Sequence, residues 1–339
     1  MRQAITYDDV LLVPSYNNYE SRREVDISMT DRTGQLTMSL PLFTSNMDTI
    51  TDHRMAKYIR TKGGRGVLHR FMSIEDNVLE YKRSPSDSVV SIGCAAEDLE
   101  RAEALYDVGA TYFCIDVAHA HAKYVGRTIK RIREMFKNNV CIIAGNVATY
   151  AGADYLAGCN TDIIKVGIGG GSVCETRIKT GFGIPNLTSI QECARVDRSI
   201  IADGGIRTPG DVVKSLAFGA DFVMVGSMLA GTRPTPGAVV EKTVDGRVQQ
   251  FKKYRGMASA EVQEEYRGNM PEWKTSEGVS TFVPYREDED AVIADIIGGL
   301  RSGLTYAGAR NIKELQRKLD YVMVTNAGRV ESLPHRTLK

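Results

Sequence analysis

The sequence predicts a single (β/α)8 barrel. Short runs rich in β-branched residues alternate with longer charged segments whose apolar residues recur at helical spacing. Eight such runs occur, each followed by a plausible helix, which is the repeat of a (β/α)8 barrel. The length of 339 residues suits one large barrel or two medium domains. A doubly wound sheet is the alternative, but it would not need eight repeats of such similar length.

The strand-like runs follow one another along the chain. They span residues 40–47, 64–70, 88–94, 112–118, 140–147, 163–169, 199–205 and 222–228. The helix-period segments between them include residues 96–110 and 122–139. These runs predict that residues 1–339 form one barrel domain.

A long segment, residues 231–290, interrupts the last repeat and is interpreted as an active-site flap. Its first part, 240–252, resembles a hairpin that turns at Asp245 and Gly246. A helix pair within 288–319 is expected to close the barrel, and the tail after about residue 324 is polar.

Composition narrows the class of protein. The net charge of +1 gives no bulk attraction to nucleic acid or membrane surfaces. No apolar run reaches the roughly 18 residues that span a bilayer. The N-terminus carries acidic residues where a signal peptide needs an apolar core. The six cysteines are scattered without a CxxC pair, which indicates reduced thiols and a cytoplasmic location.

Polar residues gather where the strand-like runs end. They are Asn46, Asp48, His69, Arg70, Asp116, His119, Asn146, the loop 167–174, Asp203 and Ser227. In a (β/α)8 barrel the loops at this end of the strands form the active site. His119, like His121, is interpreted as a residue at a helix start.

The loop GIGGGSVCETR, residues 167–177, combines flexible backbone with reactive groups. Its glycines let the backbone approach a ligand closely and aim carbonyls at a cation or amides at an anion. Cys174 at the barrel mouth is placed to act as a nucleophile. Thr176 adds a proton-relaying hydroxyl and Arg177 a fixed positive charge. The loop is not a dinucleotide-binding fingerprint.

The ends of the seventh and eighth runs predict a phosphate site. Loops after these strands commonly bind phosphate through backbone N–H groups. Gly204, Gly205, Gly226 and Ser227 suit that role. Asp203 repels phosphate and is expected to accept hydrogen bonds from a ribose. A phosphorylated nucleoside is therefore the expected ligand.

The motifs taken together resemble a known family. TYDDVLLVPS, SNMDT, GGRGVLH, GIGGGSVCETR, IADGGIRTPGDV, YRGM and SEG occur in the order seen in inosine-5′-monophosphate dehydrogenases and guanosine-5′-monophosphate reductases. The resemblance covers residues 5 to about 324. It implies a (β/α)8 barrel, a homotetramer, a covalent thioimidate intermediate at C2 of the purine, and a nicotinamide cofactor.

Two features favour the reductase branch of this family. The regulatory insert that dehydrogenases usually carry is absent, since residues 69–94 run straight on. Only twenty positions separate Met257 from Glu277, which is the reductase spacing. Tyr266-Arg267 has the reverse order of the dehydrogenase Arg-Tyr pair and lies too early. The resemblance then implies reduction of GMP by NADPH to IMP and ammonia.

Other functions remain candidates. One is an IMP dehydrogenase that lacks the insert, and another is a non-catalytic barrel that binds purine nucleotides. A modified or deoxy guanine nucleotide also remains open as substrate.

The resemblance implies roles for individual residues. Cys174 is the expected nucleophile, and Thr176 with Glu277 the pair that protonates the departing amine. A monovalent cation, K+, is expected at Gly169, Gly171, Cys174 and Arg177. The expected nucleotide contacts are Ser172, Asp203, Gly204, Gly205, Gly226, Ser227, Gly256, Met257, Ala258, Lys274, Thr275, Ser276, Glu277 and Gly278. The expected NADPH contacts are Ser21, Arg22, Arg70, Asp116, Val117, Ala118, Gly167, Ile168, Met257, Trp273, Lys274, Ser302, Gly303, Leu304 and Thr305.

The sequence departs from the family pattern at a few positions. Gly170 stands where proline is usual, Ala258 replaces a serine, and Trp273-Lys274 replaces an aromatic-arginine pair. The stretches IADGGIR and YRGM read more like the dehydrogenase branch.

Overall fold

The protein is a closed parallel barrel, as the sequence predicts, in a computed structural model that describes residues 3–268, 270–273 and 275–334. The strand order around the barrel is β4-β5-β6-β7-β8-β9-β10-β11, with β11 pairing back onto β4. The barrel strands are β4 (Leu42–Thr44), β5 (Arg65–Leu68), β6 (Val89–Ile92), β7 (Tyr112–Asp116), β8 (Cys141–Val147), β9 (Ile163–Val166), β10 (Ser199–Asp203) and β11 (Phe222–Val225). All eight predicted runs therefore contain a barrel strand.

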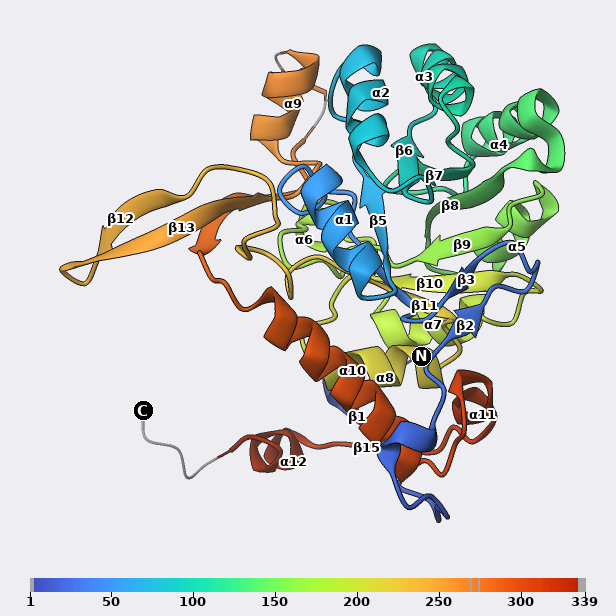
Figure 1. Ribbon diagram of the computed structural model, residues 1–339, viewed down its shortest axis with the longest axis vertical. Coiled ribbons are helices and arrows are strands. Elements are labelled where there is room, and N and C mark those ends of the chain that lie inside the picture. The colour runs from blue at the N-terminus through green and yellow to red at the C-terminus, as the bar shows by residue number, and fades with distance from the viewer. Residues whose placement is uncertain (1–2, 269, 274, 335–339) are drawn as a thin grey trace.

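The strands consist of nearly continuous apolar residues because a parallel barrel buries both of their faces. Helices follow the strands and surround the barrel (Figure 1). They are α1 (His53–Thr61), α2 (Ile74–Arg83), α3 (Ala96–Asp107), α4 (Lys123–Phe136), α5 (Tyr150–Gly158), α6 (Thr176–Thr180), α7 (Asn186–Cys193), α8 (Pro209–Ala217) and α10 (Glu289–Tyr306). Side-chain caps fix several of their starts, such as Asp52 on α1 and Thr208 on α8.

Segments outside the barrel repeats bring the N-terminal part of the chain into contact with its C-terminal part. The strand β1 (Val10–Leu12) pairs antiparallel with β15 (Tyr321–Met323). The short strands β2 (Met29–Thr30) and β3 (Thr37–Met38) form a separate hairpin. Two more short helices, α11 (Ile312–Arg317) and α12 (Asn326–Glu331), follow α10, so the polar tail begins with a helix.

The flap contains a three-stranded antiparallel sheet and one helix. The strands β12 (Val240–Val244) and β13 (Arg247–Arg255) form the predicted hairpin, and β14 (Ser280–Pro284) pairs with β13. The turn lies at Asp245 and Gly246, which both have positive φ. Figure 1 shows this hairpin extending away from the barrel. The helix α9 (Ala260–Arg267) lies beside α2, where the ring of Tyr266 is 5.8 Å from that of Phe71.

No helix in the described ranges combines the length and the apolar character needed to cross a lipid bilayer.

Candidate active site

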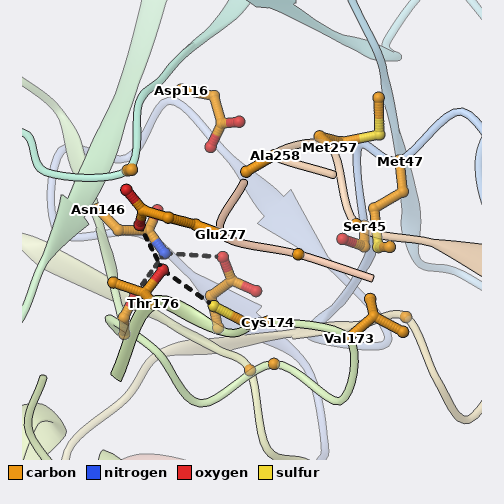
Figure 2. Close-up of a pocket in the computed structure, with 18 of the residues that line it drawn as sticks. Ser45, Met47, Asp116, Asn146, Val173, Cys174, Thr176, Met257, Ala258 and Glu277 are labelled. Carbon is orange, nitrogen blue, oxygen red and sulfur yellow. Dashed lines mark hydrogen bonds between the residues drawn. The ribbon is translucent and has the colours of Figure 1, made fainter. Parts of the chain in front are cut away.

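A pocket of about 560 Å³ opens at the C-terminal ends of the barrel strands, where the sequence places the active site. Its walls include residues at or just after the C-terminal ends of β4, β5, β7, β8, β9, β10 and β11, together with flap residues between Tyr254 and Gly278. Figure 2 shows Cys174, Thr176 and Glu277 facing one another in this pocket. The loop carrying Cys174 and the flap therefore form one cavity.

The flap is attached to the cysteine loop through backbone hydrogen bonds. The N–H of Glu175 donates to the carbonyl of Glu277 over 2.7 Å, and the N–H of Val279 donates to the carbonyl of Val173 over 3.0 Å. Cys174 thus forms a β-bridge with Gly278. A Cβ at Gly278 would lie only 3.1 Å from the Val173 carbonyl, so a larger residue would push the flap away. These bonds fix Glu277 over the thiol.

A chain of side-chain hydrogen bonds joins three residues that the sequence predicts to be catalytic. The Sγ of Cys174 lies 3.2 Å from the Oγ1 of Thr176, which donates to Glu277 Oε2 over 2.8 Å. All three side chains are half-buried. A carboxyl group that acts through a hydroxyl can, when protonated, deliver a proton to a group bound at the thiol and, when ionised, remove one from it. The arrangement is that of a nucleophile with an adjacent acid–base pair.

All but one of the described residues predicted to bind a nucleotide line the same pocket. The lining includes Ser172, Asp203, Gly204, Gly205, Gly226, Ser227, Gly256, Met257, Ala258, Thr275, Glu277 and Gly278. Ser276 is not among these residues, and its hydroxyl donates to the Gly278 carbonyl over 2.9 Å. Lys274 lies outside the described residues. The Ser172 hydroxyl is 2.8 Å from that of Tyr254, so two hydroxyls converge near the glycine turns.

A buried ionic network lies at the floor of the pocket. Lys165 Nζ is 2.7 Å from Asp116 Oδ1 and 2.8 Å from Asp203 Oδ2. Asn146 Nδ2 also donates to Asp203 Oδ2, over 2.9 Å, and to the Gly167 carbonyl over 2.7 Å. Burial would raise the pKa of Asp116, but the ammonium of Lys165 outweighs it and holds that pKa below its usual value. Asp203 faces the pocket already oriented by two donors.

No histidine in the described part of the chain belongs to the reacting cluster. Burial lowers the pKa of His69 below its usual value, so this side chain is neutral at neutral pH. His119 and His121 are exposed just before α4, as the sequence predicts.

The glycine loop fits the predicted monovalent cation in its donor chemistry. Alkali ions prefer neutral oxygens such as backbone carbonyls. Gly169 has φ of +78°, and a Cβ at Gly171 would lie 3.3 Å from Cys174 Cβ, so the tight turn needs glycine. The guanidinium of Arg177 donates instead to the carbonyls of Ile168 and Ile184. Any contribution of Arg177 to a cation site would therefore come through its backbone oxygen.

The predicted cofactor contacts divide into two groups. Arg70, Asp116, Val117, Ala118, Gly167, Ile168 and Met257 line the pocket. Ser21, Arg22 and residues 302–305 do not line it, because they lie where the 3-10 helix η2 (Arg22–Glu24) meets α10. Leu304 is fully buried there. Trp273, in the flap, is 84% exposed and also lies off the pocket walls.

Sequence reasoning missed three polar residues of the site. Lys165 interrupts the apolar run 163–169, and a charged residue within a buried strand could have identified it. Tyr254 is the first residue of the YRGM motif, yet only the fold brings its hydroxyl to Ser172. Asn186 supports the loops from below by donating to the Gly204 carbonyl, and no local pattern marks it.

Comparisons of the sequence and of the structure with known proteins agree on one family. The sequence model of the IMP dehydrogenase / GMP reductase domain matches residues 4–335. Human GMP reductase 2 is 37% identical over 334 residues, which cover 95% of this chain and 94% of the relative.

Two solved structures are similar in fold. The inosine 5′-monophosphate dehydrogenase of Legionella pneumophila has a TM-score of 0.88 and 65% identity, covering 96% of this chain and 100% of that one. A GMP reductase variant of Trypanosoma brucei, solved in complex with guanosine 5′-monophosphate, has a TM-score of 0.90 and 27% identity, covering 100% of this chain and 99% of that one.

Proposed function

The chain belongs to the IMP dehydrogenase / GMP reductase family of oxidoreductases, and within that family we propose that it is a GMP reductase. The proposed reaction converts GMP and NADPH to IMP, ammonia and NADP+. The observation that carries the proposal is the hydrogen-bonded chain from Cys174 through Thr176 to Glu277, completed by a short flap. Human GMP reductase 2, at 37% identity over most of both chains, supports the same branch.

The residues divide the reaction into two steps. The Cys174 thiolate attacks C2 of the purine, and the amine leaves from that carbon after it takes a proton relayed by Thr176 and Glu277. The resulting thioimidate accepts a hydride at C2, and the C2–S bond breaks to release IMP and the thiolate. NADPH, when bound, supplies the hydride. The flap lies over Cys174 through its backbone bonds and keeps water from the intermediate.

Nucleotide binding is assigned to the glycine turns and the Asp203 carboxylate. The backbone N–H groups near Gly204 and Gly226 would hold the phosphate, and Asp203 would accept from a ribose hydroxyl. Gly169, Gly171 and Cys174 would hold K+ through their carbonyls, and the ion would add order to the loop. Replacing K+ with tetramethylammonium at constant ionic strength should then lower kcat several-fold.

The cofactor site is proposed to include a second copy of the chain. Within one copy, Ser21, Arg22 and residues 302–305 lie away from the pocket, although the resemblance assigns them to NADPH. A neighbouring copy in the expected homotetramer would bring them to it. Dilution of the protein below the dissociation constant of the oligomer should then raise KM for NADPH. A KM that does not depend on protein concentration would contradict this arrangement.

IMP dehydrogenase is the second candidate, because the Legionella structure with that name is 65% identical. The two reactions share the thioimidate and differ in its fate, since a dehydrogenase must hydrolyse it. Tyr266 lies in the last turn of α9 and packs on Phe71, and it does not line the pocket of Cys174. Its absence from the walls of that pocket supports the reductase proposal.

One assay separates the candidates. Purified protein is mixed either with GMP and NADPH or with IMP and NAD+, while the absorbance of the reduced nicotinamide is followed. We expect loss of absorbance with release of ammonia in the first mixture. Steady formation of reduced cofactor and xanthosine monophosphate in the mixture of IMP and NAD+ would show that the protein is a dehydrogenase and not a reductase. Absence of turnover in both would favour a nucleotide-binding barrel.

A further inference from the structure

Lys165 is a buried cation on the floor of the pocket. It lies in β9, and its side chain is only 3% exposed. The neighbouring strand makes room for it, because a Cβ at Gly145 would lie 2.6 Å from Lys165 Cβ. A lysine is rarely buried unless it is paired, so its partners explain its presence.

Those partners are two carboxylates with different expected ligands. Asp116 ends β7 and belongs to the predicted cofactor contacts, whereas Asp203 ends β10 and belongs to the predicted nucleotide contacts. Their side chains remain 25% and 20% exposed, and both line the pocket. Lys165 therefore bridges the two halves of the site by bonds of 2.7 and 2.8 Å.

We propose that Lys165 is a positioning residue that couples the nucleotide and cofactor halves of the site by holding Asp116 and Asp203 in one hydrogen-bonded unit. The inference rests on the proposed function, from which it takes the ligand roles of the two carboxylates. An ionised carboxylate only accepts hydrogen bonds. The unit therefore selects ligands that present donors to both positions, such as a ribose hydroxyl and an amide N–H.

Electrostatics explains why the coupling depends on the ammonium. Burial alone would lower the pKa of Lys165, but Asp116 and Asp203 outweigh it and raise that pKa above its usual value. Without the ammonium, two carboxylates would share one partly buried site, and such pairs retain a proton to a higher pH. The other titratable groups that interact with the unit, among the described residues, are Cys94, Cys114, Arg70, Tyr7 and Tyr254.

The first test needs no ligand. Unfolding of wild type, Lys165→Met and Lys165→Arg is measured between pH 6 and 9. The shared proton stabilises folded Lys165→Met at low pH and is lost as pH rises, so its unfolding constant relative to wild type should rise by up to about tenfold per pH unit. Lys165→Arg should follow wild type, because it keeps the charge. A constant ratio for Lys165→Met would overturn the proposal.

Lys252→Met is the matched control for burying a methionine in place of a lysine. Lys252 is also 3% exposed, but its ammonium donates to backbone carbonyls, including those of Thr232 and Thr235, and lies off the pocket. Burial lowers the pKa of Lys252 below its usual value, so the unfolding constant of Lys252→Met relative to wild type should stay flat at the low end of this pH range and rise only toward its high end. A pH trend equal to that of Lys165→Met would assign the effect to burial alone.

The second test measures binding of GMP and of NADP+ by calorimetry, with IMP as an additional nucleotide. The ratio of the Kd of Lys165→Met to that of wild type should fall by up to about tenfold per pH unit between pH 6 and 9, because a donor ligand must displace the shared proton. This ratio cancels the titration of the ligand itself. Adding Asp116→Asn to Lys165→Met removes one of the two charges and should abolish the trend for GMP. A trend that persists in the double variant would refute the coupling.

The proposed function and this inference fail in different measurements. The proposed function is decided by turnover of the wild type. The inference about Lys165 is decided by the unfolding constants and Kd values of the variants relative to wild type. If Lys165→Met does not fold, the proposal is tested by the Kd of Asp116→Asn for GMP. Lys165 would then pair only with Asp203 and compete with the ribose, so the Kd for GMP should rise at least threefold. An unchanged Kd would overturn the proposal.

Discussion

The hydrogen bonds between Cys174, Thr176 and Glu277 predict a specific pattern of losses on mutation. Thr176→Ala removes the link between thiol and carboxylate, and Glu277→Gln removes the charge that accepts from Thr176 over 2.8 Å. A hydrogen bond to a charged group contributes about 1.5–3 kcal/mol, or roughly one to two decades in rate. Loss of a positioned acid–base group typically costs about 10²- to 10⁴-fold. Each single variant should therefore lose about 10²- to 10⁴-fold in kcat for GMP reduction.

The double variant should lose little more than the worse single variant, because residues that relay one proton act as a unit. The assay is oxidation of NADPH by GMP, with ammonia measured in parallel. Hydride transfer from IMP to NADP+ involves no departing amine and should be less affected. Thr180→Ala is a suitable control, since Thr180 lies on the same helix, off the pocket walls, and its hydroxyl donates to the Thr176 carbonyl over 2.6 Å. Losses that multiply in the double variant would show separate roles and refute the relay.

The remaining predictions concern the nucleophile, the cofactor and pH. Cys174→Ala should abolish turnover while GMP still binds, and mass spectrometry of the trapped wild type should find the adduct on the peptide that holds Cys174; an adduct elsewhere would remove the assignment. Arg70→Ala and Arg22→Ala should each raise KM for NADPH by about tenfold, equivalent to about 1.4 kcal/mol, and barely change KM for NADH; equal weakening of both cofactors would argue against contact with the 2′-phosphate. Because burial depresses the pKa of His69, its stabilising effect is present above the unfolded value of about 6.5 and is lost as pH falls below it. Denaturant unfolding at pH 5 to 7 should show this decline in wild type and a weaker one in His69→Asn, whereas parallel declines would point to other groups.

The barrel could be predicted from the sequence because its determinants are local. Each strand is a short buried run followed by a capped helix, and that pattern is visible within about 30 residues. The proximity of Cys174 and Thr176 was also predictable, since both lie in one glycine-rich loop, whereas their catalytic roles stay predictions. The resemblance supplied Glu277, which the flap brings to Thr176 from 101 positions away.

The rest of the site depends on side-chain geometry that no local pattern encodes. Lys165 is recognisable only as a charge in an apolar run, and its partners Asp116 and Asp203 come from two other strands. Tyr254 meets Ser172 because the flap returns over the barrel. Arg22 was assigned to the cofactor by its position in a motif, yet one copy of the fold holds it away from the pocket.

The pairing of β1 with β15 has a consequence for how the chain acquires its structure. Val10 pairs with Met323, about 310 positions later, so this contact is among the most non-local that the chain makes. The entropic cost of closing a loop grows only slowly with its length, and folding of the barrel between the two strands brings them together, so the pairing is expected to form after the barrel. During synthesis the strand around Val10 leaves the ribosome long before its partner exists. It must therefore wait, unpaired along one edge, until the segment around Met323 has been made, and an unpaired strand edge in a nascent chain is open to pairing with other chains.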